Sequence, residues 1–350
     1  MKILLTGACG FAGNTIAAGL RAAREGLDIT GVDNLSRPGS ELNRSGLKKL
    51  GIMLRHLDIR SATDLDTLGP TDWVIDAAAN PSVLAGVDES TSSRQVIEHN
   101  LIGTINLLEY CKAHGAGFIL LSTSRVYSIP ALAGLKLAVK KNAFRPVAQK
   151  VPGLSSRGIS EGFATEPPLS LYGAAKRASE QLVLEYGNSF QFPVYINRCG
   201  VLAGAGQFGK ADQGIFSFWI HSYRARKPLK YIGFDGRGHQ VRDCLHPRDL
   251  VPLLLKQMSG GKGPVICNFA GGVKNSMSLR QLSAWCAEKF GPLPIGSDRR
   301  ARPFDLPWLV LDSAKAAKGW KWWPETDLKT LLEEIAIHAE KFPDWLEISR

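Results

Sequence analysis

Three residues of this chain have the types and the order needed to move a proton. Thr123 ends an apolar run, and Tyr172 and Lys176 lie four residues apart in the stretch LYGAAK. On a helix this spacing places both side chains on one face, so the lysine ammonium could stabilise a tyrosinate and lower the tyrosine pKa towards neutrality. Such a tyrosine is a candidate general acid/base for a hydroxyl group. Alone, the pair also fits the surface of an amphipathic helix.

A glycine-rich stretch, TGACGFAG (6–13), stands between an apolar run and a helical pattern. Gly7, Gly10 and Gly13 lack the Cβ that would hinder a tight exit from a strand, the approach of a pyrophosphate and close packing of the next helix. That helix would aim free N–H groups and its positive dipole end at phosphate. A glycine triplet also fits an ordinary turn, but its place between strand and helix favours nucleotide binding.

Asp33 strengthens this interpretation because it ends a second apolar run, 29–32. It lies roughly 20 residues beyond the turn, where a carboxylate accepts hydrogen bonds from a ribose. The carboxylate would repel the extra phosphate of NADP, so NAD is the favoured cofactor. Arg37 is either a phosphate clamp or a surface arginine.

The composition is that of an ordinary globular protein, with 44% hydrophobic and 21% charged residues among 350. The length suits a main domain with a smaller partner. The chain has no apolar run of the ~18 residues that span a membrane, and Met1 begins a strand pattern. We therefore expect a cytoplasmic protein without a membrane partner. Six cysteines without a CxxC pair and seven scattered histidines predict no metal site and no disulfide framework.

The net charge of +11, from 43 basic and 32 acidic residues, favours an anionic partner. Nucleic acid and a diphosphate-containing substrate both fit, but the second needs only a few local charges, so we expect no nucleic-acid partner. The excess is concentrated in 136–157, which holds several basic and no acidic residues. This segment fits a basic flap or, more simply, a solvated loop.

Alternating strand and helix patterns indicate a parallel sheet. Strand patterns at 52–57, 73–78 and 117–122 are separated by helical patterns at 61–68 and 91–114. We expect an α/β fold, with a Rossmann-type doubly wound parallel sheet and a smaller C-terminal α/β substrate-binding lobe. The NAD-binding domain is predicted to comprise 1–196 and 240–270, and the lobe 197–239 and 271–350.

Further candidates lie at the expected carboxyl edge of the sheet, where ligands of doubly wound folds bind. Asp58 follows a strand pattern and is either an adenine contact or a cap of the next helix. The small residues of DAAANPSV (76–83) would permit close backbone approach to a cofactor or tight strand–helix packing. Asn100 is a possible hydrogen-bonding partner of the cofactor.

The regular alternation loosens from about residue 197, where glycine, basic and aromatic residues gather, among them Arg198, Gln207, Phe208, Asp212 and Gln213. This region begins the predicted substrate lobe.

Two arginines further along, Arg242 and Arg302, could clamp a diphosphate because guanidinium offers a fixed fork of donors. Salt bridges to Asp243 and Asp305 are the alternative. The tryptophans of 319–325 precede an amphipathic helix at 326–340, and packing explains them better than base stacking.

Together these motifs resemble the extended short-chain dehydrogenase/reductase family, the NAD-dependent nucleotide-sugar epimerases and dehydratases. The resemblance covers nearly the whole chain and is carried by TGACGFAG, Asp33, Asp58, Asn100 with GTINLLE, STSRVY, LYGAAK, QVRDCLHPRDL and RPFD. Within the family, the chain is most similar to the branch of CDP-paratose (CDP-tyvelose) 2-epimerases, through DNLSRPGS, QFGKADQG, GHQVRDCLH and GGVKNSMSL.

The resemblance implies an NAD-dependent nucleotide-sugar 2-epimerase. Tyr172, assisted by Lys176 and Thr123, would accept a hydroxyl proton as hydride leaves the sugar, and the ketone would then receive the hydride on its other face. A 4-epimerase or reductase of another nucleotide sugar, and a non-catalytic NAD-binding sensor or scaffold, are the alternatives. Ser124 and Arg125 stand where dehydratases of the family have an acidic pair, so water elimination is disfavoured.

The resemblance also implies the binding residues and the assembly. The expected cofactor contacts are Gly7, Gly10, Phe11, Ala12, Gly13, Asp33, Asn34, Ser36, Arg37, Asp58, Ile59, Ala77, Ala78, Ala79, Asn100, Tyr172 and Lys176. The expected contacts to a CDP-linked sugar are Asn80, Arg125, Gln207, Gln213, Arg242 and Arg302. We further expect a homodimer through helices 91–114 and 171–187, or a homotetramer. Three residues depart from the family pattern: Asp76, Ser128 and Ser160. Together with the basic segment 136–157 beside the expected sugar pocket, they leave the identity of the substrate open.

Overall fold

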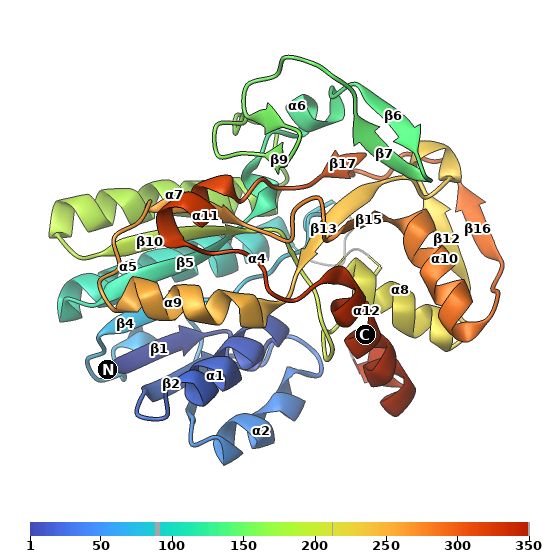
Figure 1. Cartoon of the computed structure of the whole chain (residues 1–350). Helices are drawn as coiled ribbons and strands as arrows, with labels where there is room; N and C mark the ends of the chain where they lie inside the picture. The colour runs from blue at the N-terminus through green and yellow to red at the C-terminus, as the bar shows by residue number, and fades with distance from the viewer. Residues whose placement is uncertain (88–91, 212, 349–350) are drawn as a thin grey trace.

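The structure is a computed structural model that describes residues 1–87, 92–211 and 213–348. Its centre is a seven-stranded parallel sheet of order β14-β10-β5-β4-β1-β2-β3 (Figure 1). The strands are β1 (Lys2–Thr6), β2 (Asp28–Asp33), β3 (Met53–His56), β4 (Trp73–Asp76), β5 (Gly117–Thr123), β10 (Val194–Cys199) and β14 (Ile266–Phe269). The order reverses at β1, which pairs with β2 on one side and β4 on the other. The predicted doubly wound sheet is confirmed.

Helices cover both faces of this sheet because its strands are apolar on both sides. In β1, Ile3 and Leu5 pack into one core and Leu4 into the other, as the two-residue repeat of a strand requires. The first core is closed by α1 (Phe11–Ala23), α2 (Asn43–Lys49), α9 (Val251–Met258) and α11 (Ala314–Trp320). The second is closed by α3 (Ala62–Leu65), α5 (Gly103–His114) and α7 (Leu171–Phe190).

The helix expected over 91–114 is interrupted. Its described part consists of α4 (Ser93–Ile97), a π-helical turn η2 (Glu98–Ile102) and α5. Asn100 lies within the turn, and its amide group donates both to the carbonyl of Val96 and to that of Asn80 outside the helix. Such π-bulges occur frequently at functional sites.

The C-terminal lobe has its own core between α8 (Ile215–Arg224), α10 (Leu279–Phe290) and α12 (Leu328–Lys341), with α13 (Trp345–Ile348) against α8. A parallel pair joins β12 (Leu229–Ile232) to β16 (Ile295–Asp298). The lobe's small sheet contains β11 (Val201–Leu202), β13 (Val241–Leu245), β15 (Ser276–Ser278) and β17 (Trp308–Leu309). Thus β13 pairs within the lobe, whereas β14 belongs to the main sheet and α9 packs against it. The exact domain boundaries stay a prediction.

The basic segment 136–157 is not the solvated loop that was the simpler expectation. It forms two hairpins, β6 (Leu137–Lys140) with β7 (Ala143–Pro146) and β8 (Leu154–Ser155) with β9 (Gly158–Ile159). Apolar residues of these strands pack into a fourth core with α6 (Ile129–Ala133) and β17. That packing explains the difference, and four lysines, at 136, 140, 141 and 150, remain exposed.

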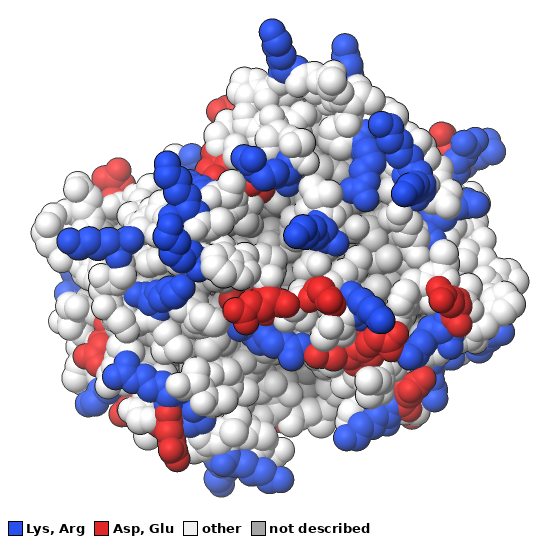
Figure 2. All heavy atoms as spheres, in the orientation of Figure 1, with Lys and Arg blue, Asp and Glu red and all other residues white. Residues whose placement is uncertain are grey.

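Basic side chains are spread over most of the face shown in Figure 2, and several acidic ones gather in a band across its middle. The C-terminal tryptophans confirm the packing interpretation, since Trp320 and Trp322 are buried and Trp323 is 60% exposed. In the described part of the chain, no helix is long and apolar enough to cross a membrane, and no cluster of histidine, cysteine or carboxylate side chains could hold a metal ion.

Candidate active site

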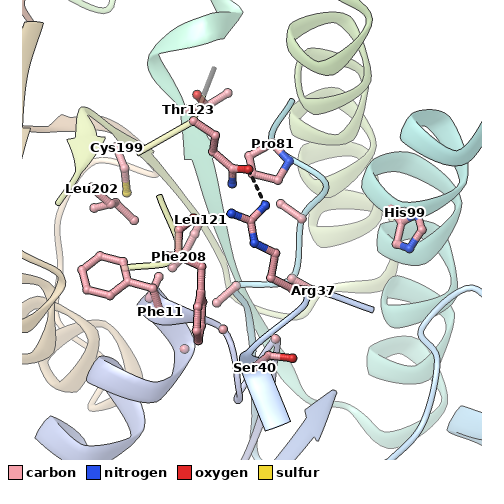
Figure 3. Close-up of a pocket in the computed structure, with 18 of the residues that line it drawn as sticks. Phe11, Arg37, Ser40, Pro81, His99, Leu121, Thr123, Cys199, Leu202 and Phe208 are labelled. Carbon is pink, nitrogen blue, oxygen red and sulfur yellow. Dashed lines mark hydrogen bonds between the residues drawn. The ribbon is translucent and has the colours of Figure 1, made fainter. Parts of the chain in front are cut away.

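A cavity of about 360 Å³ opens at the carboxyl edge of the main sheet, beside the order reversal at β1 (Figure 3). It brings together most of the predicted residues: Gly7, Gly10, Phe11, Ala12, Gly13, Asp33, Asn34, Ser36, Arg37, Ile59, Ala77, Ala78, Ala79, Thr123, Arg125, Tyr172, Gln207 and Gln213. A second cavity of about 140 Å³ lies in the lobe, and Arg125, Val201 and Gly214 line both. The two cavities therefore adjoin.

The glycine turn leaves space that no other residue would leave. Gly7 has φ +62°, and a Cβ there would lie 2.9 Å from the Ala78 backbone. A Cβ on Gly13 would lie 2.0 Å from the Gly7 carbonyl oxygen, so α1 can pack this closely only with glycine at that position. Gly10 caps α1 without a side-chain hydrogen bond, which leaves N–H groups of the first turn for an anion. These features fit the diphosphate of a dinucleotide.

Asp33 lines the cavity at the end of β2. Its two carboxylate oxygens accept backbone hydrogen bonds from Cys9 and Leu35, each at 2.8 Å. Burial raises the pKa of Asp33, and these backbone donors oppose the rise. Because two carboxylate oxygens offer about four acceptor sites, acceptor capacity remains for ribose hydroxyls.

Asp58 does not cap the next helix, and its contact with adenine stays a prediction. It stands outside the cavity lining and forms a close ion pair with Arg60, 2.6 Å between Oδ2 and Nη2, while Asn34 donates to it at 3.1 Å. Burial opposes ionisation, but the hydrogen bonds from Arg60 and Asn34 prevail and lower the pKa of Asp58. Ser61, not Asp58, caps α3. Asp58 thus anchors the loop that carries Asn34.

Asn100 also stands outside the cavity lining, because its side chain is fully buried and engaged with the protein. Its amide donates to the Asn80 carbonyl at 2.9 Å and its oxygen accepts from the Asn80 N–H at 3.1 Å. This two-way contact fixes the chain just after Ala77–Ala79. Asn80 itself, expected to contact substrate, lines neither cavity in the described structure.

Thr123 and Tyr172 both line the larger cavity, whereas Lys176 is not part of its described lining, and the catalytic roles of the three stay a prediction. Thr123 ends β5, and Tyr172 lies in the first turn of α7, which Ser170 caps by accepting from Gly173. Thr123 and Tyr172 are hydrogen-bonded to each other. Lys176, one turn further along α7, is 1% exposed. No described residue accepts a hydrogen bond from its ammonium, so a ligand group can complete its contacts.

The expected lowering of the Tyr172 pKa by Lys176 is not found in the chain by itself. Burial raises the pKa of Tyr172 to about 12, although the hydrogen bond with Thr123 and the charge of Arg125 act in the opposite direction. Desolvation of the phenolate outweighs its polar neighbours here. A tyrosine in this state holds its proton until another positive charge comes near.

Arg37 is not the surface arginine that was one of its two interpretations. Its guanidinium donates to Oε1 of Gln213 at 2.7 Å, drawn dashed in Figure 3, and to the carbonyl of Phe208. Arg37 therefore connects the loop after β2 to the segment that enters the lobe. Asp212, in the same stretch, lies outside the described residues.

The second cavity gathers three arginines around one carboxylate, and its net charge is positive. Arg242 pairs with Asp305 at 2.9 Å, so the salt-bridge alternative is confirmed for it. Asp243 instead accepts from the Leu311 N–H. Arg302 donates to the carbonyl of Ala211 at 3.1 Å and forms no salt bridge to Asp305 within 4.0 Å.

Arg125 completes this arginine group. Burial lowers its pKa to about 10, the charge of Arg242 adds to the lowering, and Asp305 opposes it. The charged form of Arg125 is therefore destabilised by burial and by the charge of Arg242. An anionic ligand in this cavity would stabilise it.

Sequence reasoning missed several lining residues. Leu121, Cys199 and Leu202, labelled in Figure 3, form an apolar wall, and their places at or beside strand ends could have indicated them. The second cavity also contains Gln240 and Met277. Gln240 lies two residues before Arg242 and could have been found from that spacing, whereas Met277 reaches Arg242 only through the pairing of β15 with β13.

Comparison with known proteins agrees with this geometry. Residues 3–268 match the NAD dependent epimerase/dehydratase family. A CDP-paratose 2-epimerase of Salmonella typhi is 30% identical over 354 residues, which cover 96% of this chain and 98% of the relative. A UDP-glucuronate 4-epimerase of Thermodesulfobacterium geofontis is 28% identical over 337 residues, 93% of this chain and 92% of the relative.

Solved structures share the fold. The UDP-glucose 4-epimerase of Bifidobacterium longum in complex with NAD⁺ and UDP has a TM-score of 0.79 at 20% identity, covering 99% of this chain and 100% of that one. The UDP-glucose 4-epimerase of Thermus thermophilus in complex with NAD has a TM-score of 0.77 at 24% identity, covering 97% and 99%. With its glycine turn, its Asp33 and its matched family domain, this chain belongs to the NAD-dependent epimerase/dehydratase family of enzymes and uses NAD as its cofactor.

Proposed function

We propose that this enzyme is a nucleotide-sugar 2-epimerase of the CDP-paratose/CDP-tyvelose type. One observation carries the proposal: Thr123 and Tyr172 line the larger cavity, and Arg125 lies where that cavity adjoins the arginine-lined one. A sugar bound between the two would present a hydroxyl to Tyr172 and a diphosphate to the arginines. The CDP-paratose 2-epimerase named above supports the choice of nucleotide and carbon, since it aligns over nearly both full chains.

Tyr172 is the proposed general base and acid of the reaction. When bound, NAD supplies a reversible hydride acceptor and brings a positive charge to the cavity. That charge and the ammonium of Lys176 would lower the Tyr172 pKa from its high value in the chain alone. Tyr172 then accepts the hydroxyl proton, with Thr123 holding the phenolic oxygen in place, and returns it once the ketone has exposed its other face.

The arginine-lined cavity is the proposed diphosphate site. Arg302 and Arg125 line it, and neither forms a salt bridge within 4.0 Å to a carboxylate of the described residues, whereas Arg242 is held by Asp305. Guanidinium groups bind diphosphates through paired hydrogen bonds. A diphosphate site of this kind supports a substrate in which the sugar is linked to a nucleoside diphosphate. Other contacts would have to recognise the base.

Epimerisation is favoured over elimination of water by the residues after Thr123. Ser124 and Arg125 are not acids, and among the described residues that line the larger cavity Asp33 is the one carboxylate. Without an acid beside the sugar, removing a hydroxyl as water lacks a proton donor. The ketone therefore survives to take back its hydride.

A panel of CDP-, UDP-, GDP- and dTDP-sugars tests the proposal. Each is incubated with the enzyme, and the configuration at every sugar carbon is followed by NMR. Inversion at C2 of a CDP-linked deoxyhexose is expected. Inversion at C4 of a UDP-sugar would replace it with the 4-epimerase alternative, which the UDP-glucuronate 4-epimerase relative favours. Tight NAD binding without turnover of any sugar would favour a sensor or scaffold.

We also propose a homodimer through the helices of 92–114 and α7. Ile102 and Leu171 are 39% and 37% exposed on this side of the molecule, and burying apolar side chains of this kind stabilises subunit contacts. Light scattering at micromolar concentration should give twice the 38.0 kDa chain mass. A monomer would contradict the assignment, and a tetramer would extend it.

A further inference from the structure

The last described helix, α13, lies against the larger cavity. Phe208 lines the cavity and is 4% exposed. Its outer face stacks on Trp345 of α13, with ring centroids 5.1 Å apart and an angle of 16° between the planes. The indole Nε1–H of Trp345 also donates to the Gln207 carbonyl at 2.9 Å. The helix that comes last in the sequence therefore holds two consecutive residues of the cavity wall.

The loop after β2 meets the same two elements. Gly39 has φ +89°, and a Cβ there would lie 2.8 Å from the Phe208 ring and 2.9 Å from Cγ2 of Ile348 in α13. Arg37, two residues earlier, donates to the Phe208 carbonyl. Three segments distant in sequence thus converge on Phe208: the loop that follows the Asp33 strand, the start of the lobe and the C-terminal helix.

Trp345 is itself held firmly. It is 8% exposed, and the ring of His338 in α12 meets it edge-on with centroids 4.7 Å apart. Lys227, just after α8, forms an ion pair with Glu347 in α13. A side chain fixed on the far side in this way can resist outward movement of Gln207 and Phe208.

We propose that α13 acts as a clasp on the dinucleotide cavity and that Trp345 is a positioning residue for NAD retention. The inference rests on the proposed placement of NAD in this cavity. Trp345 does not touch the reacting atoms; it holds Phe208 against the cavity and Gln207 at its edge. When that contact is lost, the wall opens more often and NAD leaves faster, while the geometry of Thr123, Tyr172 and Lys176 is unchanged.

The test compares Trp345→Ala with Trp323→Ala, which removes the 60% exposed tryptophan and serves as the matched control. Each protein is loaded with NAD and freed of excess nucleotide, and bound NAD is measured over time after dilution. Trp345→Ala should release NAD about tenfold faster, because a weakened contact acts mainly on dissociation rates. Trp323→Ala should stay within about twofold of the unsubstituted enzyme.

A second variant keeps the proposal testable if Trp345→Ala does not fold. Trp345→Phe retains a stacking ring but loses the Nε1–H donor, so NAD release should be faster than in the unsubstituted enzyme and slower than in Trp345→Ala. With saturating NAD, turnover should be near normal and only the NAD concentration for half-maximal rate should rise. Release from both Trp345 variants at the unsubstituted rate would overturn the clasp.

The assay needs no sugar, so its outcome is separate from the proposed function. The NAD-release assay would therefore test the clasp even if the enzyme bound NAD and epimerised no sugar. Gly13→Ala checks the placement of NAD, because its Cβ would meet the Gly7 carbonyl oxygen at 2.0 Å. If Gly13→Ala retains NAD as the unsubstituted enzyme does, NAD lies elsewhere and the clasp is refuted with its placement.

Discussion

The two adjoining cavities are built in different ways. The glycine turn of the larger cavity is a local structure: Gly7, Gly10 and Gly13 shape it within seven residues, and Asp33 follows on the next strand of the same sheet. The arginine-lined cavity takes Arg125, Arg242 and Arg302 from three separate stretches of the chain. The glycine turn tolerates few substitutions because its residues shape one another. In the arginine-lined cavity, one contact can change while the others stay in place. The cofactor turn is therefore the less tolerant of the two to a single substitution.

The largest effect should come from Tyr172 in the larger cavity. Tyr172→Phe removes the proposed proton acceptor and leaves the ring in place, so kcat should fall by about 10²–10⁴-fold. NAD content should be unchanged, because the glycine turn is untouched. Turnover by the sugar NMR assay and NAD content after gel filtration check both parts. Unchanged turnover would favour the scaffold alternative.

The local character of the cofactor site is tested by adding one methyl group. Gly13→Ala should abolish stable NAD binding and cost about 1–3 kcal/mol of unfolding free energy, because the turn cannot hold its shape. Gly26→Ala is the control, since a Cβ there meets nothing within 4 Å. NAD titration and thermal unfolding of both variants give the measurement. Equal NAD affinity in the two would mean that NAD lies away from the glycine turn, as in the NAD-retention test.

The assembled character of the second cavity is tested by a pair of arginines. Arg302→Met should raise KM for the nucleotide sugar by about 10–100-fold, because a charged hydrogen bond to diphosphate is lost. Its unfolding temperature should change little. Arg242→Met should lower the unfolding temperature as well, because Asp305 loses its partner in a setting where both side chains are largely buried. The reverse pattern would exchange their proposed roles.

A smaller effect is expected at Thr123. Its hydrogen bond lowers the pKa of Tyr172 against the rise caused by burial. Thr123→Val removes that bond, so the Tyr172 pKa should rise further and the rate should reach its plateau at higher pH, with about a tenfold loss at neutral pH. Rate profiles from pH 6 to 10, roughly spanning the titration of a perturbed tyrosine, check the shift. A loss of rate with no shift would indicate that Thr123 only positions substrate.

The smallest effect concerns acid stability of the lobe. Burial lowers the pKa of His221 to about 3 and those of His246 and His338 to about 4, from 6.5. The unfolded chain therefore binds these protons more readily than the folded one. Their stabilisation is complete above pH 6.5 and is lost as the pH falls towards 4. Thermal unfolding at pH 7 and pH 5 should show a lower Tm at pH 5, and His338→Gln should reduce the difference.

By itself the sequence determined the parts whose chemistry is local. The glycine spacing, Asp33 at a strand end and the four-residue step from Tyr172 to Lys176 each follow from the geometry of one strand, turn or helix. They were enough to predict the sheet and the cofactor, and they supply the proposed proton-transfer group. The family match then agreed with them.

Only the tertiary structure decided which partner each of these side chains takes. Asn100 turned inward to hold Asn80, Asp58 paired with Arg60, and the basic segment 136–157 folded onto a fourth core. Trp345 became part of the wall behind Phe208. The physical reason is that a polar or aromatic group takes whichever partner burial brings to it. That partner can lie two residues away, as Arg60 does from Asp58, or more than one hundred, as Trp345 does from Phe208.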